Sequence, residues 1–352
     1  MPRFHTTIVA AILLLPIIPS ATHAEKNLVR PPGTTRYQPM VARLKSMLAY
    51  DHAHGAGRMG LSSIGMSVKG RSLWMVTLRD PSVTAEQTKK VFYLCRQHGH
   101  EPASTEAALS FAAKLVKAGP DDPLADTLKH VTVYIVPMAN PDGSEKFLRH
   151  NARDVDLNRD WLKRTQPETR AIYKTVFRLH PDLMTDQHEL YPSDSRGDFT
   201  ETVGPLGRAM PQVVDSCMGT QQIVQLSMAS EGFHTRSCVI DDGHPARLAH
   251  RYENVKGGVP TILFETNRSN GGGRSVAARA EAHERFMTVI LRDLAGERDQ
   301  LLSEAEARGF TIPSGLAPQV PAVAGEEQLP ASDETLAAPA PTMGDEGERE
   351  GP

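Results

Sequence analysis

The stretch "VFYLCRQHGHEPASTEAALSFAAKLVKAG", residues 91–119, combines two hydrophobic periodicities in one short segment. Its first residues are apolar and β-prone, which is typical of a buried strand. Its second half has apolar residues at helical spacing, with Ser104 or Thr105 expected at the N-cap and Gly119 in the stop signal. A strand that leads directly into a helix favours an alternating α/β architecture, and the polar corner between the two is the natural place for a site.

Segments of the same two kinds alternate along the chain. Strands are expected at 72–79, 90–97, 130–141, 181–189 and 258–267, and helices at 104–119, 165–179 and 275–296. Thr165 and Glu168 have the spacing of a capping box at the start of the second helix. Strands that are apolar throughout and separated by helices predict an α/β fold, with a mostly parallel mixed sheet and helices on both faces. In such sheets, active sites lie at the carboxyl ends of the strands.

The N-terminus has the layout of a secretory signal peptide, assigned to residues 1–24. Arg3 and His5 precede an apolar run at 8–20, and a small-residue cleavage site ends at Ala24. The apolar run is short for a membrane span, which leaves an uncleaved anchor as the weaker alternative. We therefore expect a secreted or periplasmic protein with no stable membrane insertion after signal removal.

The C-terminus has a different composition from the rest of the chain. Residues 315–352 include six prolines, eight acidic residues, one arginine and no aromatic residue. Such a segment buries too little apolar area to offset its ordering entropy, so we predict a folded domain at 25–310 and a disordered acidic, Pro/Ala-rich tail at 311–352. Residues 25–314 have a net charge of +3 and no basic stripe, which gives no support for a nucleic-acid partner.

Three cysteines are too few for a disulfide scaffold. Cys217 and Cys238 lie 21 residues apart and can close a loop in an oxidising compartment. Cys95 lies in an apolar strand and is expected to be a small buried hydrophobe.

The corner after the strand at 90–97 holds His98, His100 and Glu101. His98 and Glu101 are three residues apart, so an imidazole and a carboxylate can face one ion, and His188 at the end of another strand is the best placed third ligand. Zinc prefers such a set, and a catalytic zinc has three protein ligands and one position for water. His100 is expected to point away, as a surface or supporting residue.

Five short motifs follow one another along this chain. They are "QHGHEP" at 97–102, "NPDG" at 140–143, "RHNARDVDLNRDW" at 149–161, "DQH" at 186–188 and "LFET" at 263–266. On these motifs the sequence resembles the zinc carboxypeptidases of the carboxypeptidase A type, in particular their compact bacterial members, over roughly residues 60–294. The resemblance implies the zinc carboxypeptidase fold for the domain at 25–310.

The resemblance also implies catalytic roles. It assigns one Zn²⁺ to His98, Glu101 and His188, and it makes Glu265 the general base for the water that attacks the peptide bond. Arg149 corresponds to the arginine that polarises the scissile carbonyl, with Arg153 as a competing assignment. Glu265 has plainer alternatives as a helix N-cap or as the ion-pair partner of nearby Arg268.

Further positions correspond to residues that hold the substrate or the ligands. Asn158 and Arg159 match the pair that grips the terminal carboxylate, and Asp156 matches the carboxylate that orients the first histidine ligand. Tyr252 is the candidate for the family's mobile tyrosine, with Tyr191 as the runner-up.

The resulting hypothesis is a secreted zinc metallocarboxypeptidase that cleaves a C-terminal bond of peptides or of peptidoglycan-derived stem peptides. Arg247 and Arg251 suggest some preference for an acidic group. Two alternatives stay open: a zinc-dependent deacylase of N-acyl amino acids, and a zinc- or peptide-binding module without turnover.

Overall fold

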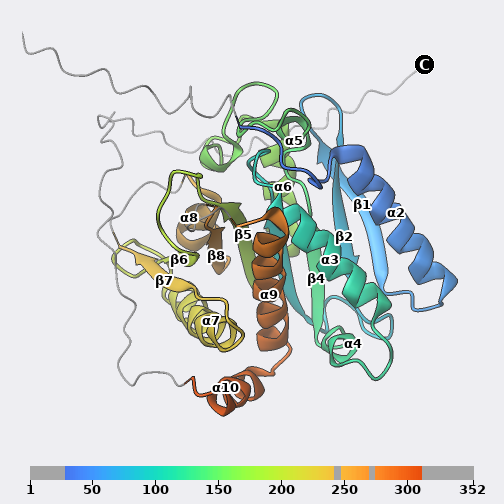
Figure 1. Ribbon diagram of the computed structural model, residues 1–352, viewed down its shortest axis with the longest axis vertical. Coiled ribbons are helices and arrows are strands. Elements are labelled where there is room, and N and C mark those ends of the chain that lie inside the picture. The colour runs from blue at the N-terminus through green and yellow to red at the C-terminus, as the bar shows by residue number, and fades with distance from the viewer. Residues whose placement is uncertain (1–27, 242–246, 269–273, 311–352) are drawn as a thin grey trace, which may run out of the picture. The chain divides into compact units, whose positions relative to one another are not determined.

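The computed structural model describes residues 28–241, 247–268 and 274–310, and within these ranges an eight-stranded sheet runs through the middle of the molecule (Figure 1). The signal peptide expected at 1–24 and the tail expected at 311–352 lie outside the described residues. Among the described residues, no helix has the length and apolarity needed to cross a membrane.

The strands follow the order β1-β2-β4-β3-β5-β8-β6-β7 across the sheet. Their bounds are β1 Met59–Met66, β2 Ser72–Leu78, β3 Lys89–Cys95, β4 Val131–Val136, β5 Leu183–Glu189, β6 Phe199–Val203, β7 Arg236–Ile240 and β8 Thr261–Thr266. Neighbours are parallel in the pairs β3–β4, β3–β5, β5–β8 and β6–β7, and antiparallel in β1–β2, β2–β4 and β6–β8. The predicted mostly parallel mixed sheet is therefore confirmed.

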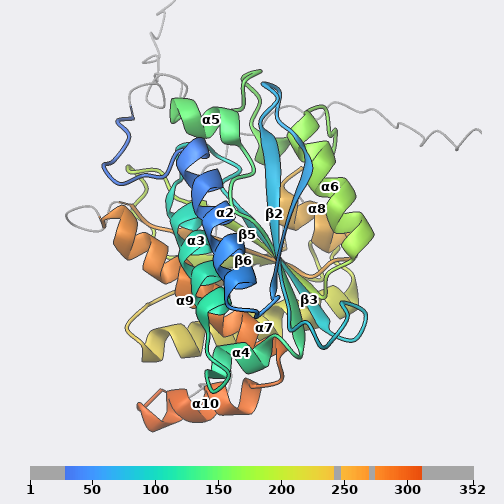
Figure 2. The same ribbon diagram turned by 90° about the vertical axis from the view of Figure 1, so that its right-hand side faces the viewer.

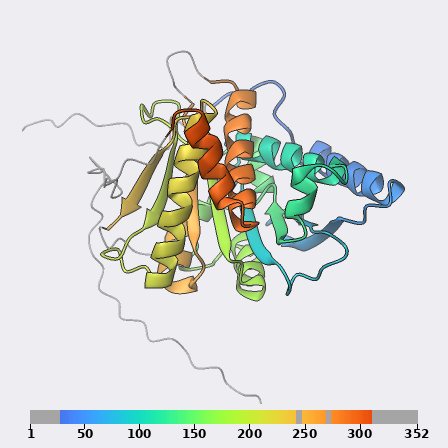
Figure 3. The same cartoon turned by 90° about the horizontal axis from the view of Figure 1, so that it is seen from below.

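The central strands are buried because helices cover both faces of the sheet. One face is covered by α2 (Tyr37–Ala53), α3 (Ala103–Lys117), α7 (Pro211–Ser230) and α9 (Val276–Leu294), with α10 (Arg298–Ala307) packed beyond α7 and α9. The other face is covered by α6 (Pro167–Leu179) and α8 (Ala249–Tyr252). Figures 2 and 3 show the two layers, with α2, α3 and α9 on one side of the sheet and α6 on the other.

Shorter elements complete the fold at the ends of the strands. They are α4 (Pro123–Thr127), α5 (Pro141–Lys146), a 3-10 helix at Leu157–Arg159 and a π-helix at Glu253–Gly257. The expected "NPDG" turn is the start of α5, because Asn140 caps that helix by accepting a hydrogen bond from Gly143 N at 2.8 Å.

Both capping predictions are wrong in detail. α3 begins one residue earlier than expected, after Pro102, and has no side-chain cap. α6 begins after Gln166, also without one, and Thr165 instead donates its hydroxyl to Asp160 at 2.7 Å. The helices themselves are where the periodicity predicts them, because burial of their apolar stripes decides their position more strongly than a cap does.

The three cysteines are free and buried. Cys95 lies in β3, as expected. Cys217 contacts Asn254 and Thr261 from α7, whereas Cys238 belongs to a separate small cluster with Leu190. The disulfide considered between Cys217 and Cys238 is therefore not formed, because the sheet topology places the two thiols in different packing environments.

Candidate metal centre

A short corner joins β3 to α3 and carries two ligand-type side chains. β3 ends at Cys95 and α3 begins at Ala103. Arg96 leaves the strand with φ at 59°, in the left-handed region, which turns the chain sharply. Inside the corner, His98 Nδ1 lies 2.8 Å from Glu101 Oε1.

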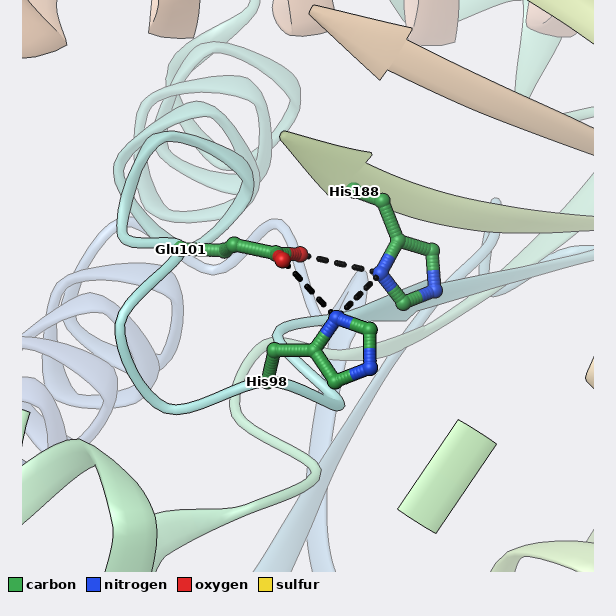
Figure 4. A group of neighbouring side chains, drawn as sticks. All are labelled: His98, Glu101 and His188. Carbon is green, nitrogen blue, oxygen red and sulfur yellow. Dashed lines mark hydrogen bonds and ion pairs between the residues drawn. The ribbon is translucent and has the colours of Figure 1, made fainter. Parts of the chain in front are cut away.

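The neighbouring strand supplies the third side chain. β5 runs parallel to β3 and is paired with it, so the carboxyl ends of the two strands meet at this corner. His188 Nδ1 lies 2.9 Å from Glu101 Oε2 and 3.0 Å from His98 Nδ1. All three side chains are almost fully buried, and Figure 4 shows the two imidazoles and the carboxylate turned toward one another. The structure thus brings together the three ligands predicted from the sequence.

The far nitrogen of each histidine faces a carboxylate. His98 Nε2 lies 3.0 Å from Asp156 Oδ1, and His188 Nε2 lies 2.9 Å from Asp186 Oδ1. A carboxylate at Nε2 holds the proton there, orients the ring and leaves the Nδ1 lone pair for a metal ion. Two Nδ1 atoms and one carboxylate form the donor set of a catalytic zinc site, so the residues present fit the ion.

The electrostatics of the three groups are tightly linked. Burial disfavours the charged form of Glu101, but His98 and His188 outweigh that effect and hold the pKa of this carboxyl well below its usual range. Burial likewise opposes protonation of His188, yet the neighbouring Asp186 and Glu101 raise its pKa well above the ordinary value. The carboxylates around the two histidines therefore stabilise a positive charge at this cluster, and a bound cation can supply that charge.

Asn140 braces the corner from the side of α5. Its Nδ2 lies 3.1 Å from both Gln97 O and Arg149 O, while its Oδ1 caps α5. The "NPDG" motif thus connects the segment with His98 to the segment with Arg149. Its role here is to position two parts of the site relative to each other.

Arg149 lies beside the ligands. Its Nε donates to Asp156 Oδ2 at 2.9 Å, and its Nη1 is 3.7 Å from Glu101 Oε1. Burial opposes the charge of Asp156, but His98 and Arg149 together hold its pKa well below the usual range. Arg153, the competing assignment, is exposed to solvent. Of the two arginines, Arg149 is the one within reach of the site.

Two residues that sequence reasoning missed hold His188 in place. Asp186 Oδ1 faces the His188 ring and also accepts a hydrogen bond from Gln97 Nε2 at 2.7 Å, and Gln97 in turn accepts one from Trp161 at 2.8 Å. The "DQH" motif contains a usable signal, because residues two apart in a strand share a face. That Gln97 reaches Asp186 depends on the pairing of β3 with β5.

Asn158, one of the two residues predicted to bind the terminal carboxylate, is already engaged within the protein. Asn158 Nδ2 lies 3.1 Å from His188 Nε2, and its Oδ1 accepts a hydrogen bond from Ala249 N at 2.9 Å. Its amide therefore contacts a ligand and the start of α8. Arg159 ends the 3-10 helix, is half-buried, and lies close enough to Asp156 to help lower the pKa of that carboxyl.

Glu265 lies next to His188 in the sheet. The two residues are directly paired between β8 and β5. Burial raises the pKa of Glu265 to about 8, against a smaller opposing effect of His188. Its Oε2 is buried and has no hydrogen-bond partner among the described residues. Arg268 is ion-paired elsewhere, with Glu101 and Glu189, so the plainer reading of Glu265 as its partner is not what the contacts show.

The two tyrosine candidates have different surroundings. Tyr252 packs in an aromatic cluster, with its ring 6.4 Å from Trp161 and 5.8 Å from Tyr173. Tyr191 lies near the ligands instead, with its ring 5.5 Å from the Arg149 guanidinium carbon. The runner-up from the sequence is the tyrosine that the fold places beside Arg149.

His100 does not lie on the surface. It is 1% exposed, its Nδ1 is 3.8 Å from Glu101 Oε1, and its ring packs edge-on against Tyr191 at 5.8 Å. Burial lowers its pKa to about 3, so the ring is neutral. The tight turn after Arg96 directs this side chain into the protein, which the sequence spacing alone does not reveal.

Comparisons with known proteins agree with this geometry. Residues 47–186 match the sequence profile of a family described as zinc carboxypeptidase. The matched region contains the corner, Arg149 and Asp156, while His188 and Glu265 lie beyond it and are added by the fold.

Curated relatives carry similar descriptions. Carboxypeptidase SOL1 of Arabidopsis thaliana is 37% identical over 123 residues, covering 32% of this chain and 25% of the relative. A zinc carboxypeptidase of Saccharothrix mutabilis subsp. capreolus is 30% identical over 144 residues, covering 40% of this chain and 30% of the relative. The chain therefore matches only about a quarter to a third of the length of these relatives.

Solved structures share the fold. A metallo-carboxypeptidase from Burkholderia cenocepacia superposes with a TM-score of 0.61 at 21% identity, covering 72% of this chain and 68% of the other. A carboxypeptidase A from Helicoverpa armigera gives 0.58 at 16% identity, covering 75% and 74%. The likeness reaches well beyond the segment matched in sequence.

Proposed function

Since residues 47–186 match the zinc carboxypeptidase family and the fold is shared with solved carboxypeptidases, we propose that the protein is a zinc-dependent carboxypeptidase that hydrolyses the C-terminal peptide bond of peptides. The observation that carries this proposal is the convergence of His98, Glu101 and His188 beside Glu265. Three ligands leave one position of a tetrahedral ion for water, and a carboxylate next to it can act as a base.

Glu265 and Arg149 have separate roles in the proposed reaction. Zinc, held by His98, Glu101 and His188, would lower the pKa of a water molecule to about 7 and polarise the scissile carbonyl. Glu265 takes the proton from the attacking water and delivers it to the leaving amine. Its unpartnered Oε2 supports that role. Arg149 is held by Asp156 and donates to the oxygen that becomes negative in the transition state.

Selection of a chain terminus needs a group that binds a carboxylate. A guanidinium can donate two parallel hydrogen bonds to such a group, and we assign this function to Arg159. Asn158 contributes less in this proposal than the family resemblance implies, because its amide already contacts His188 and Ala249. Tyr191, next to Arg149, is a better candidate than Tyr252 for a tyrosine that touches the substrate.

The location and the natural substrate are part of the same proposal. The layout of residues 1–24 supports export to the periplasm or the outside of the cell. An exported carboxypeptidase encounters peptides and the stem peptides of the cell wall, and we propose these two classes as substrates.

A digest experiment tests the proposal and separates it from its alternatives. The zinc-loaded protein is incubated with a peptide library, with peptidoglycan fragments and with N-acetyl-aspartate, and the products are read by mass spectrometry. Removal of single C-terminal residues is expected, with one zinc per chain in the wild type and none in His188→Ala. Cleavage of N-acetyl-aspartate alone would indicate a deacylase, and bound zinc without any cleavage would indicate a binding module.

A further inference from the structure

Arg268 lies at the site without a role in the chemistry described so far. It follows the end of β8 by two residues and is 9% exposed. Its Nη2 is 3.8 Å from Glu101 Oε1, and its Nε is 3.5 Å from Glu189 Oε2. The guanidinium is therefore buried beside a predicted metal ligand.

Both carboxylates near Arg268 are already engaged by closer partners. Glu189 accepts a hydrogen bond from Ala103 N at 2.7 Å and another from Arg279 Nε at 2.5 Å. Glu101 faces the two histidine ligands at 2.8 and 2.9 Å. As a result, Arg268 Nε and Nη2 have no hydrogen-bond partner among the described residues.

These two nitrogens form one edge of the guanidinium plane. An edge with two parallel N–H groups matches the two oxygens of a carboxylate. The two ion pairs of this edge, at 3.5 and 3.8 Å, are too long for hydrogen bonds. Burying two such donors without a hydrogen bond is unfavourable, and a ligand that accepts from both recovers the loss. A cation bound by Glu101 would also neutralise one of the two carboxylates that Arg268 faces. The attraction between Arg268 and an anionic ligand would then be stronger.

Two other donors surround the same oxygen of Glu101. Arg149 Nη1 lies 3.7 Å and His100 Nδ1 lies 3.8 Å from Glu101 Oε1. Neither ring nitrogen of His100 has a hydrogen-bond partner among the described residues, although the ring is buried. These donors and Arg268 lie 3.7–3.8 Å from the one oxygen of Glu101, too far for a hydrogen bond, so a further anionic acceptor beside Glu101 would satisfy them.

We propose that the Nε–Nη2 edge of Arg268 binds a second carboxylate of the substrate, carried by an acidic side chain in one of the two residues that flank the cleaved bond. This inference rests on the proposed carboxypeptidase function and names its substrate class. It also reassigns the acidic preference suggested by the sequence, because Arg251 is engaged by Glu201 at 3.2 Å.

Matched substrates test the proposal. N-acetylated dipeptides are compared in pairs that differ only by Glu against Gln, at the last or at the preceding position. In at least one pair we expect kcat/KM to be about tenfold or more higher for the Glu member, the size of one charge-assisted interaction. Arg268→Gln is expected to bring that ratio near one, whereas the control Arg251→Gln keeps it. Equal rates for both members in the wild type, or an unchanged ratio in Arg268→Gln, would overturn the proposal.

A binding measurement makes the result independent of turnover. Glutarate and its half-amide glutaramate are titrated into the zinc-loaded protein and followed by ligand-observed NMR. Tighter binding of glutarate is expected in the wild type, with the preference lost in Arg268→Gln and reduced in Arg268→Lys, which keeps the charge but not the two-donor edge. Equal affinities in the wild type refute the subsite even if no variant folds. Glutarate selectivity without hydrolysis of any peptide would refute the carboxypeptidase function and leave the subsite standing.

Discussion

Each histidine ligand is held from behind by an aspartate, and the two aspartates come from different parts of the chain. Asp156 follows the corner by more than fifty positions and reaches His98, while Asp186 lies on the same strand face as His188. Both bonds go to Nε2, so both rings present Nδ1 to the shared space. The preference for one ring nitrogen is therefore built into the fold.

We expect Asp186→Asn to weaken zinc binding by about 10- to 100-fold, as is typical for loss of a carboxylate behind a histidine ligand. The amide can still occupy the space but no longer holds a full negative charge against the ring. Competition with a chromogenic chelator measures the affinity. Asp160→Asn is the matched control, because Asp160 is buried as well, and its carboxylate accepts the hydrogen bonds of Thr165 and Gln166, away from the histidines. Unchanged affinity in Asp186→Asn would show that Asp186 does not support the ligand.

Glu265 is the side chain on which turnover depends in this proposal. Glu265→Gln is expected to keep zinc and to lower kcat by about 10²- to 10⁴-fold, the usual contribution of a general base. Metal analysis and peptide assays on the same preparation measure both quantities. Glu253→Gln controls for general effects of replacing a buried carboxyl group by an amide. Wild-type turnover in Glu265→Gln would remove this glutamate from the mechanism.

At the level of elements, the site depends on close contact between the corner after β3 and the start of α5. A Cβ built on Gly99 would overlap the backbone of Gly143 and Ser144. Asn140 also joins this region, because its side chain donates to the carbonyl oxygens of Gln97 in the corner and of Arg149. Two backbones can approach this closely only where a side chain is absent.

Gly99→Ala is expected to destabilise the protein by about 1–3 kcal/mol, the usual cost of overpacking, and to weaken zinc binding because the corner must shift. Urea unfolding and zinc titration measure the two effects. Gly119→Ala is the control, since a Cβ there has open space around it, and its effect is expected to stay within about 0.5 kcal/mol. If both variants behaved alike, the tight contact at the corner would have no energetic importance.

At the scale of the whole molecule, the sequence predicts the middle of the sheet well and its margins poorly. The strands β3, β4, β5 and β8 are apolar runs buried on both faces, and each was predicted within a few residues. β1 reads "MGLSSIGM", is largely exposed, and has no clear alternation. β6 reads "FTETV" and is buried by β7 and β8 at its sides and by α7 and α8, so its position depends on tertiary contacts that local sequence does not encode.

The candidate site was likewise predicted only in part from the sequence. The sequence predicts the three residues that converge at the candidate metal centre, from their spacing, their strand ends and the family resemblance of the motifs. The contacts of Gln97 and Asp186, and those of Arg268 with Glu101 and Glu189, were not predicted, since they depend on which strands are neighbours and on where the segment after β8 turns. The inward position of His100 depends likewise on the left-handed turn at Arg96.

A buried glutamate far from the ligand set in sequence makes the stability of the whole domain depend on pH. Glu253 begins the π-helix, is almost fully buried, and has one carboxyl oxygen without a hydrogen-bond partner among the described residues. Burial raises its pKa from 4.5 to about 7, and Arg164 opposes the shift only in part. The folded protein therefore holds a proton on Glu253 that the unfolded chain releases at lower pH.

The proton on Glu253 decides whether stability rises or falls with pH. Between pH 4.5 and about 7 the folded state binds it more tightly than the unfolded state, so this group's contribution to stability falls as the pH rises, by roughly 3 kcal/mol in total. Glu253→Gln cannot ionise and is expected to gain stability relative to the wild type as the pH is raised from 5 to 8. Urea unfolding of both proteins at these two pH values measures the difference. If the two free energies of unfolding differed equally at pH 5 and pH 8, Glu253 would titrate with an ordinary pKa, and its buried carboxyl would have to be satisfied by a partner.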